Sequence, residues 1–407
     1  MPQNKPRILL VTPSAPFPPT NGGMLRIVSL VQALKDDFDF SLLTFTHSSG
    51  ERKFTEAAKL IALEGLFKEI HSVPKETVIT DPRACPPLPR IARDWFSPAM
   101  AAAVMELSPA YDILHVEFLQ MAFYVRYSGA PVSFFTEHDL GHLSLFSSYF
   151  REWTGLRRFA EIPEWLRVRA YHSAVCAEYK RIVVLTDYDR RLLAKKTPAG
   201  KLVLVKTGTN LARFPFRAPL REHLAAPLVY VGHYPHFPNE DAALWFCRRV
   251  FPLITRSLPG TKLILAGSQP SPAIEALAVP GGPVSVTGEV PDINEYLSRS
   301  SVFVAPVRLG FGIKGKVLEA FSAGIPVVAT SLVARGIPEA RPGEHLLVAD
   351  TPKDFAAAVA RLKTDFPLYE RMALAARALA EKHYSWKDLA LELARAYSAA
   401  VGGEAKP

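Results

Sequence analysis

The residues best suited to chemistry stand in a loop at 307–314 and at the start of the helix that we expect to follow it. Two glycines of this loop, Gly310 and Gly312, let the backbone approach a ligand closely. The backbone amides at the helix start form an anion site that the helix dipole reinforces. The cationic side chains at the same place are those of Arg308, Lys314 and Lys316. We therefore expect this segment to bind a diphosphate.

Glu319 lies three residues after Lys316, so the two side chains share one face of the expected helix. A carboxylate at this position can accept hydrogen bonds from a vicinal diol such as that of a ribose. The alternative is structural. In that case the glycines only make a tight turn, and Lys316 and Glu319 form an exposed ion pair worth about a few tenths of a kcal/mol.

His138 stands between Glu137 and Asp139, at the end of a strand expected over 132–136. Ligands of open α/β sheets bind beyond the carboxyl ends of the strands, which makes His138 a candidate for a ligand contact. Its expected role is a hydrogen bond rather than acid catalysis. A histidine hydrogen-bonded within the protein is the alternative.

No set of residues in the sequence suggests a metal site, and we expect a metal-independent protein without a cofactor. His233 and His236 flank a proline in a loop but lack an acidic residue in a suitable place. Asp187 and Asp189 match the sequence pattern of a metal-chelating DxD pair, but we expect them to lie at the start of a surface helix. Neither a disulfide framework nor a zinc site is indicated by the three widely separated cysteines, Cys85, Cys176 and Cys247.

Short apolar runs alternate with helical patterns along the chain, which predicts an α/β fold with doubly wound parallel sheets. In the first half the expected strands cover residues 7–12, 38–45, 113–116, 132–136, 182–185 and 202–205. In the second half they cover 228–232, 262–266, 284–287, 302–306, 327–330 and 346–348. Expected helices include 24–34, 241–254, 316–323 and 386–400, and Asn239 is the expected N-cap of the second of these.

The 407 residues are too many for one compact core and suit two domains. The strand and helix pattern breaks at 207–226 and restarts at 228. We expect an N-terminal Rossmann-like domain over 1–210, a linker over 211–226 and a C-terminal Rossmann-like domain from 227. A central cleft between the two domains would place the loops after the strands around one ligand site.

Hydrophobic residues make up 49% of the chain, but no run of about 18 apolar residues and no secretory leader pattern occurs. We expect a cytoplasmic protein. The formal net charge is +9, and residues 151–201 hold twelve Lys or Arg against six Asp or Glu, which is +6 of that total. Such a basic surface suits nucleic acid, anionic lipid or a phosphate-bearing substrate, and charge does not choose among them.

Aromatic residues are interleaved with arginines over residues 145–171. Aromatic side chains at headgroup level together with basic charge are the composition of interfacial helices. We therefore expect part of this stretch to contact an anionic membrane or a lipid-linked acceptor at the inner face of the membrane. The alternative is an ordinary helix that packs its aromatic side chains into the N-terminal core.

Segment 306–330 resembles the donor-binding motif of retaining glycosyltransferase family four, in a bacterial subgroup that reads about PxRxGxGxKxKxLEAxAxGxPVVAT. The matching residues are Pro306, Arg308, Gly310, Gly312, Lys314, Lys316, Leu318, Glu319, Ala320, Gly324, Pro326, Val327, Val328 and Thr330. Further similar segments are PFPPTNGGMLRIVSLVQAL from Pro16, HVEFLQM from His115, FFTEHDL from Phe134, LVYVGHYPHFPNEDAALWF from Leu228, TGEVPDINEYL from Thr287 and HYSWKDLA from His383. The resemblance covers nearly the whole chain.

This resemblance implies the GT-B fold, with the C-terminal domain ending at 382 and residues 383–407 packing back on the N-terminal domain. It implies transfer of a sugar, with retention, from a nucleoside diphosphate sugar to a glycan, lipid-linked or other acceptor. Nucleic acid is not an expected partner. The catalytic candidates are His138, Lys316 and Glu319. The donor-binding candidates are Gly22, Gly23, Gly288, Glu289, Val290, Arg308, Gly310, Gly312, Ile313, Lys314, Val317 and Leu318.

Two positions depart from the family pattern. Eight residues before Glu319, where the wider family usually has another glutamate, this chain has Phe311. After the first strand of the C-terminal domain it has His233 instead of the frequent arginine and lysine. The positive charge that neutralises a bound diphosphate must then come from the basic residues of the 307–316 segment.

Three other functions are alternatives to sugar transfer. A sugar-nucleotide epimerase has the same architecture but needs no acceptor. A catalytically silent GT-B subunit that scaffolds a polysaccharide complex is favoured only by the missing first glutamate. A dehydrogenase is disfavoured because the loop after the first strand lacks the GxGxxG spacing that a dinucleotide needs.

Overall fold

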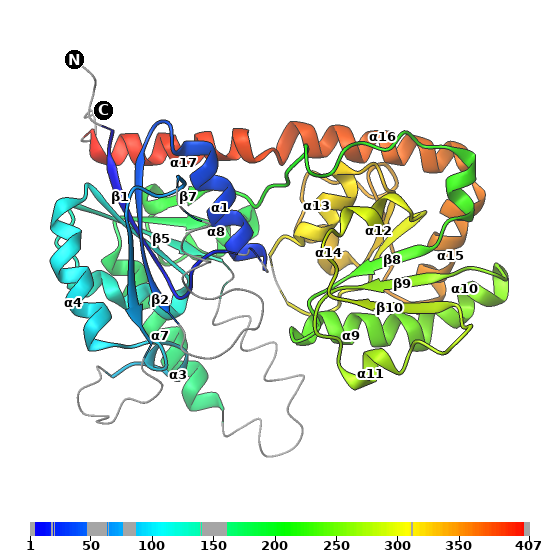
Figure 1. Cartoon of the computed structure of the whole chain (residues 1–407), viewed down its shortest axis with the longest axis horizontal. Helices are drawn as coiled ribbons and strands as arrows, with labels where there is room; N and C mark the ends of the chain where they lie inside the picture. The colour runs from blue at the N-terminus through cyan, green and yellow to red at the C-terminus, as the bar shows by residue number, and fades with distance from the viewer. Residues whose placement is uncertain are drawn as a thin grey trace. The chain divides into compact units, whose positions relative to one another are not determined.

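The computed structural model describes residues 5–17, 19, 21–46, 63, 65–75, 87–138, 140, 161–310 and 312–402 of the chain. The chain divides into two compact units (Figure 1). Unit 1 comprises Met1–Lys206 together with Trp386–Pro407, and unit 2 comprises Thr207–Ser385. The last helix of the chain therefore belongs to the same unit as the first strand, and the residues expected to form a linker fall within unit 2.

In its described residues, unit 1 contains a parallel sheet of seven strands in the order β3-β2-β1-β4-β5-β6-β7. The central strands are buried on both faces and are mostly apolar, as is usual for parallel strands covered by helices, with polar side chains such as His115 and Glu117 on β4 as exceptions. The strands are β1 (Arg7–Thr12), β2 (Asp39–Thr46), β3 (Ile70–Pro74), β4 (Ile113–Glu117), β5 (Val132–Glu137), β6 (Arg181–Val184) and β7 (Leu202–Leu204).

Helices cover both faces of this sheet. On one face α1 and α17 pack together, with Ile27 and Leu30 of α1 in the same apolar cluster as Leu393 and Tyr397 of α17. On the other face α4, η3 and α7 enclose a second cluster. The bounds are α1 (Gly22–Leu34), α3 (Arg90–Arg93), α4 (Pro98–Leu107), η2 (Ser108–Ala110), η3 (Leu119–Tyr127), α7 (Ile162–Glu178), α8 (Asp187–Leu193), η4 (Ala199–Lys201) and α17 (Trp386–Val401).

Unit 2 repeats this architecture with a parallel sheet in the order β10-β9-β8-β11-β12-β13. Its strands are β8 (Leu228–Val231), β9 (Leu263–Ala266), β10 (Val284–Gly288), β11 (Val302–Ala305), β12 (Val327–Ala329) and β13 (Leu347–Val348). Its helices are η5 (Arg221–Ala225), α9 (Phe237–Trp245), the π-helical η6 (Phe246–Val250), α10 (Phe251–Ser257), α11 (Pro272–Glu275), α12 (Asn294–Ser298), α13 (Gly315–Ser322), α14 (Ser331–Arg335), α15 (Pro352–Thr364) and α16 (Phe366–His383). The prediction of two Rossmann-like parallel sheets is confirmed.

Two local predictions were wrong. The sequence analysis missed β3, an edge strand whose IHSVP sequence buries only Val73 fully and lacks a long apolar run. The helix expected from 241 begins earlier, at Phe237, and its N-cap is His236 rather than Asn239. Asn239 lies inside the first turn, where its side-chain amide donates to the carbonyl of His233 at 2.9 Å. Among the described helices, none is long and apolar enough to span a membrane.

Candidate functional site

The loop between β11 and α13 has the backbone conformation that the glycines suggested. Gly310 has a φ of 88° and Gly312 a φ of 73°, both in the left-handed region that favours glycine. α13 begins immediately after Lys314, whose side chain makes no capping hydrogen bond to the first turn. The first amides of α13 therefore face the loop without a side-chain cap from the N-cap residue, which suits an anion.

Lys316 and Glu319 form an ion pair on the first turns of α13. The Lys316 amino group lies 3.1 Å from each oxygen of the Glu319 carboxylate. The Glu319 side chain is only 6% exposed, whereas that of Lys316 is 47% exposed. The pair therefore differs from the fully exposed ion pair of the structural alternative. Its carboxylate is buried, and only the lysine side chain is exposed. Val317 and Leu318 lie between them and are buried in the core of unit 2.

Arg308 is held by residues of α9. Its guanidinium donates to Asp241 through Nε at 3.2 Å and through Nη2 at 2.6 Å, and it lies 5.1 Å from the ring centre of Trp245. This bidentate pair fixes the start of the glycine loop to a neighbouring helix. The more exposed cation of the loop and helix start is therefore Lys316, since the Arg308 side chain is 39% exposed.

Other sequence-predicted residues lie at the carboxyl ends of neighbouring strands of the same sheet. Gly288, with a φ of 67°, ends β10, and Glu289 and Val290 follow it. At the ends of β8 and β9 the backbones meet so closely that a Cβ on Gly267 would lie 1.7 Å from the carbonyl oxygen of Gly232. Because the strand order is β10-β9-β8-β11, these loops and the loop with Ile313 line one edge of the sheet.

In unit 1 the structure brings the glycine pair and His138 together. The His138 ring stacks on that of Phe118, with centroids 4.0 Å apart and an interplanar angle of 10°. A Cβ on Gly23 would lie 2.6 Å from the Phe118 ring and 3.3 Å from the His138 ring, whereas one on Gly22 would meet nothing within 4 Å. Gly23 is therefore required for α1 to approach this stack closely.

His138 is hydrogen-bonded to a buried network of polar side chains that the sequence analysis did not assign. His138 Nε2 lies 2.6 Å from Oε2 of Glu117, the last residue of β4. Thr136 donates to the other Glu117 oxygen at 3.3 Å and lies 2.7 Å from His115 Nε2. His115 Nδ1 in turn lies 2.5 Å from the hydroxyl of Tyr397 on α17. The C-terminal helix is thus connected to His138 through buried polar side chains.

Charge within this network is balanced by Arg26 of α1, which is buried and donates to the carbonyl of Lys206 at 2.7 Å. Burial alone would raise the pKa of Glu117, but the hydrogen bond from His138 and the charges of His115, His138 and Arg26 lower it to about 2. Burial lowers the pKa of His115 to about 4, although Glu117 opposes this. At neutral pH the arrangement is an ionised Glu117, a neutral His115 and a charged Arg26.

A signal for this network was present in the sequence. The segment HVEFLQM contains His115 and Glu117 two residues apart on a strand, so both side chains point to one face. Arg26 follows Gly23 by three residues on a helix, so the two residues lie on the same face of that helix. Tyr397 could not be found in this way, because only the packing of α17 on α1 brings it to β4.

The residues weighed as metal ligands do not come together. His233 Nδ1 lies 2.8 Å from the hydroxyl of Ser268. Asp187 pairs with arginines of its own helix, and Asp189 is buried and accepts from Thr186 at 2.6 Å. The described residues contain no group of three or more His, Cys, Asp or Glu that could hold a metal ion. Phe311, Asp139 and residues 145–160 of the aromatic and basic stretch lie outside the described residues.

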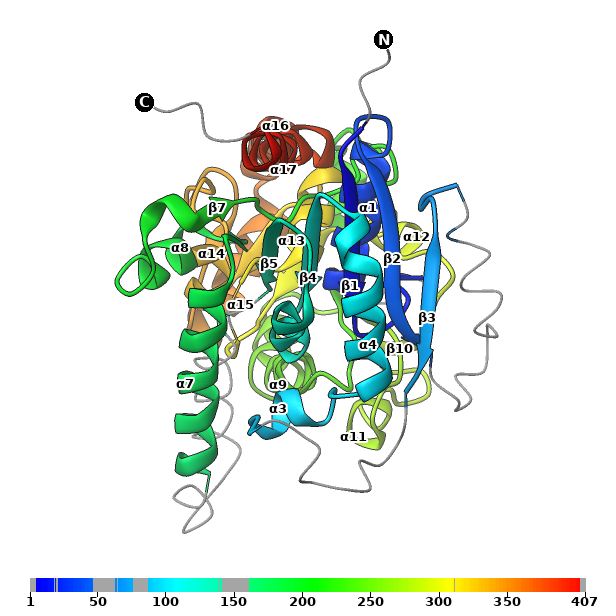
Figure 2. The same cartoon turned by 90° about the vertical axis from the view of Figure 1, so that its left-hand side faces the viewer.

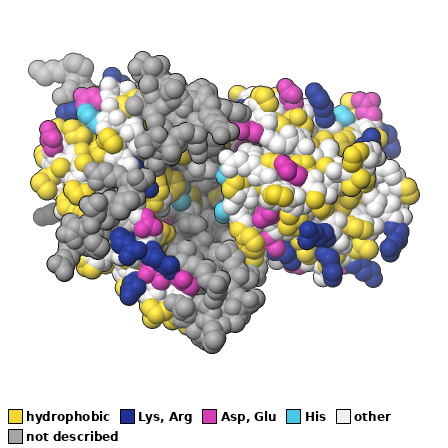
Figure 3. Space-filling view, turned by 60° about the horizontal axis from the view of Figure 1, so that its bottom comes forward, with side chains coloured by type: hydrophobic (Ala, Val, Ile, Leu, Met, Phe, Trp, Pro, Cys, Tyr) yellow, Lys and Arg dark blue, Asp and Glu magenta, His cyan; other side chains and the backbone are white. Residues whose placement is uncertain are grey.

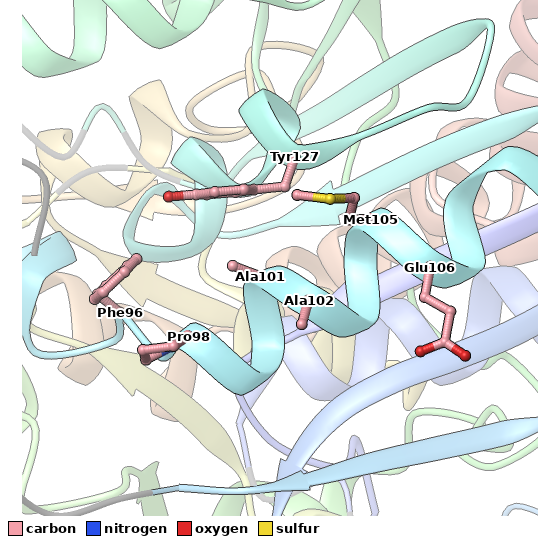
Figure 4. Close-up of a pocket in the computed structure, with 7 residues that line it drawn as sticks. All are labelled: Phe96, Pro98, Ala101, Ala102, Met105, Glu106 and Tyr127. Atoms are coloured by element: carbon pink, nitrogen blue, oxygen red, sulfur yellow. The ribbon is translucent and has the colours of Figure 1, made fainter. Parts of the chain in front are cut away.

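One apolar pocket of about 560 Å³ lies along α4. Figure 4 shows Tyr127 and Met105 together on one side of it, Phe96 and Pro98 at its end, and Glu106 pointing away from Tyr127. Its lining offers a single carboxylate and no cation, so it is not suited to the chemistry of a phosphate-bearing ligand.

Residues 226–365 match the protein family described as glycosyl transferases group 1. The glycogen synthase of Mycobacterium tuberculosis is 29% identical over 219 residues, which are 51% of this chain and 51% of that protein. The chain spans about half the length of the curated relatives it matches. The region that matches the family, residues 226–365, runs from β8 to α15, and so includes the glycine loop, Lys316 and Glu319.

Solved structures resemble nearly the whole chain. The sucrose-phosphate synthase of Thermosynechococcus elongatus has a TM-score of 0.68 at 18% identity, with 97% of this chain and 98% of that chain covered. The Anabaena protein HepE in complex with UDP has a TM-score of 0.68 at 14% identity, with 97% and 100% covered. These similarities show the GT-B fold. The chain is thus similar to glycosyltransferases in fold throughout and in sequence over its second unit.

Proposed function

We propose that this protein is a retaining glycosyltransferase that takes its sugar from a nucleoside diphosphate sugar without a metal ion. One observation carries the proposal. Within the region matching the glycosyl transferases group 1 family, a left-handed glycine loop leads into α13, where an exposed lysine is held by a buried glutamate. This arrangement suits a diphosphate at the start of the helix and a ribose beside the carboxylate.

In this proposal the amides of α13 and the amino group of Lys316 bind the diphosphate. Negative charge grows on the diphosphate as the bond to the sugar breaks, so these donors stabilise the transition state more than the ground state. Glu319 accepts hydrogen bonds from the ribose hydroxyls and orients the donor. Arg308 stabilises the loop through Asp241, a pair that engages Nε and Nη2 of its guanidinium, and adds positive charge beside the diphosphate.

His138 is proposed to make a hydrogen bond to the transferred sugar. The bond to Glu117 occupies Nε2, and no partner of Nδ1 is found among the described residues, so Nδ1 is left for the ligand. The stack on Phe118 and the absence of a side chain at Gly23 hold the ring in place and leave room beside it. These features support positioning of a sugar rather than proton transfer.

Uridine and guanosine diphosphate sugars are the proposed donors, and a glycan or a lipid-linked sugar is the proposed acceptor. HepE, which has the same fold, was solved with UDP, so uridine nucleotides are the first to test. We also propose that the protein acts in the cytoplasm, with peripheral contact to the inner face of the membrane through the aromatic and basic stretch.

A thermal-shift screen against nucleoside diphosphates and their sugars tests the proposal. A ligand at a hundred times its dissociation constant stabilises a protein by about 2.7 kcal/mol, which is readily measured. The expected result is stabilisation by one nucleoside diphosphate that Glu319→Ala abolishes. If no nucleoside diphosphate or sugar nucleotide stabilises a folded sample, the proposed donor site is wrong.

A further inference from the structure

Besides the apolar pocket along α4, unit 1 contains a polar pocket to which the proposed function assigns no role. It has a volume of about 880 Å³ and lies between α3, the end of η3 and the first four turns of α7. Its walls carry the arginines Arg90, Arg93, Arg126 and Arg167, and an apolar part that includes Leu88, Pro89 and Pro163. A pocket of this size can hold a phosphate group together with a neighbouring sugar or apolar group.

The charges of this arginine pocket are unequally exposed. Its carboxylates are nearly hidden, since the side chains of Glu161 and Glu164 are 15% and 8% exposed. The arginine side chains are between 39% and 69% exposed. The lining residues are therefore four exposed cations and two shielded anions, while Asp94 and Glu178 beside the pocket lie next to Arg93 and Arg126. Figure 3, which brings the lower side of Figure 1 forward, shows basic and acidic side chains gathered on unit 1 there.

Glutamates hold three of the arginines in place. Glu164 accepts from the backbone amide of Arg90 at 2.5 Å and from Nη1 of Arg167 at 3.2 Å. Glu161 pairs with the side chain of Arg90. Arg126 donates to Glu178 through both Nε and Nη2. Arg90, Arg126 and Arg167 are thus each oriented by a carboxylate, as in sites that bind anions through prearranged guanidinium groups.

Arg93 and Arg167 keep the most donors for a ligand. The Nε of Arg93 lies 3.9 Å from the exposed carboxylate of Asp94, which is too far for a hydrogen bond. Among the described residues, no hydrogen bond engages the terminal nitrogens of Arg93, or Nε and Nη2 of Arg167. These groups can therefore form charge-assisted hydrogen bonds to an anion that enters the pocket.

The pocket begins near the edge of the sheet that carries His138. α7 follows β5, whose carboxyl end precedes His138, and Glu161 stands immediately before α7. β1 enters the sheet beside the N-terminus at the top of Figures 1 and 2, while α3 lies toward the opposite end of the unit. The arginines of α3 are thus on the side of the carboxyl ends, where ligands of such sheets bind.

We propose that the arginine pocket binds a phosphate or diphosphate group of the acceptor. This inference rests on the proposed function, because it assigns the pocket to the second substrate of sugar transfer. The guanidinium groups hold the anion by bidentate hydrogen bonds, and the apolar wall contacts the group attached to it. The phosphate belongs either to a lipid headgroup or to a soluble phosphorylated acceptor.

Inorganic pyrophosphate titrated into the full-length chain by calorimetry tests the pocket. The test variant is Arg93→Gln with Arg167→Gln, which leaves the more closely paired Arg90 and Arg126 in place. The matched control is Arg190→Gln with Arg191→Gln on α8, where two exposed arginines pair with Asp187 and the same charge is lost. Both pairs are also made in the Lys316→Ala background, which removes the proposed donor cation.

The expected result is pyrophosphate binding that the pocket pair weakens about tenfold or more in both backgrounds, while the control pair weakens it little. Equal losses in the two pairs would overturn the proposal, because the effect would be one of overall charge. Complete loss of pyrophosphate binding in the Lys316→Ala variant alone would also overturn the pocket proposal, because all binding would then take place at the proposed donor site. That result would support the donor site. Pyrophosphate binding at the pocket without binding of any nucleotide would contradict the proposed function, and with it the assignment of the anion to an acceptor, but not the anion site itself.

Vesicle flotation identifies the source of the phosphate. Vesicles of phosphatidylcholine with and without phosphatidylglycerol are compared for wild type, the pocket pair and the control pair. Flotation with anionic vesicles that only the pocket pair loses assigns the pocket to a lipid headgroup. Pyrophosphate binding without flotation assigns it to a soluble phosphorylated acceptor.

Discussion

The imidazole of His138 is joined to the carboxylate of Glu117, with Nε2 and Oε2 2.6 Å apart. Glu117 is the last residue of β4, and His138 follows the last residue of the adjacent parallel strand β5. A second pair repeats this geometry, because His172 Nε2 lies 2.6 Å from Oε2 of Glu137. The two pairs differ in access. In the first pair the His138 side chain is partly exposed, whereas both side chains of the second pair are buried.

Glu117→Gln should lower kcat about tenfold to a hundredfold while leaving the donor dissociation constant nearly unchanged. The variant keeps the shape of the side chain but removes the charge that accepts the His138 proton, and a hydrogen bond to a charged group contributes about 1.5–3 kcal/mol. Glu137→Gln is the matched control, since it alters an equally buried carboxylate that is bound to the buried His172 instead of to His138. Similar kcat losses in both variants would mean that Glu117 acts only through folding.

The same groups predict how stability depends on pH. The folded-state pKa of His115 is depressed to about 4 from 6.5, and that of Glu117 to about 2 from 4.5. Each group therefore contributes to folding stability at pH values above its ordinary pKa. The contribution of His115 is lost as the pH falls from about 6.5 to 4, and that of Glu117 as it falls from about 4.5 to 2. Burial would lower the pKa of His172, but Glu137 and Cys176 raise it to about 10, so its contribution is lost between about 6.5 and 10 as pH rises.

Urea unfolding across this pH range measures these contributions. Wild type should have its highest stability near pH 6.5, Glu117→Gln should lose less stability below pH 4.5, and His172→Gln should lose less above pH 6.5. A stability profile of wild type that is flat on both sides would contradict the assigned charge states.

Adjacent glycines of α1 should respond oppositely to the same substitution. Gly22→Ala meets nothing within 4 Å, so it should be neutral or stabilise the helix by about 0.4–1 kcal/mol. Gly23→Ala would place a methyl group 2.6 Å from the Phe118 ring, so it should destabilise unit 1 and displace the ring stacked on His138. Thermal unfolding of both variants checks this, and an unchanged midpoint for Gly23→Ala would show that the stack is loosely held.

Lys316 and Glu319 should contribute to different kinetic quantities although they form one ion pair. Lys316→Ala should lower kcat and kcat/KM by about 2–4 kcal/mol of transition-state stabilisation, because charge on the diphosphate grows during the reaction. Glu319→Ala should mainly raise the donor KM, since contacts to ribose are equal in the ground and transition states. Circular dichroism controls for folding. Wild-type kcat and kcat/KM in Lys316→Ala would assign the diphosphate to Arg308 or Lys314 instead.

The sheets and the glycine loop could be predicted because they depend on local sequence. Apolar runs gave twelve of the thirteen strands in the described residues, and Gly310 and Gly312 have the left-handed φ values that only glycine adopts readily. The missing strand, β3, is an edge strand whose pairing with β2 outweighs its weak pattern. Short apolar runs therefore sufficed for central strands but not for the edge.

The partners of individual side chains could not be predicted, because they depend on contacts between residues distant in the sequence. Arg308 was expected at the diphosphate, but the structure pairs it with Asp241, 67 residues away. Tyr397 reaches His115 across 282 residues because α17 packs on α1. That Lys316 and Glu319 share one helix face could be predicted because three residues separate them. Their ion pair was the structural alternative to ligand binding, and that alternative had both side chains exposed, whereas Glu319 is buried.

Phosphorus and proton NMR of one reaction mixture tests the central claim most directly. The sample contains wild-type protein, the sugar nucleotide that stabilises it most and a candidate acceptor, with Lys316→Ala as the parallel sample. The account predicts release of the nucleoside diphosphate and a new glycoside whose anomeric proton has the configuration of the donor, both greatly slowed in Lys316→Ala. Conversion of the sugar while it remains attached to the nucleotide, or an inverted glycoside, would contradict retaining sugar transfer.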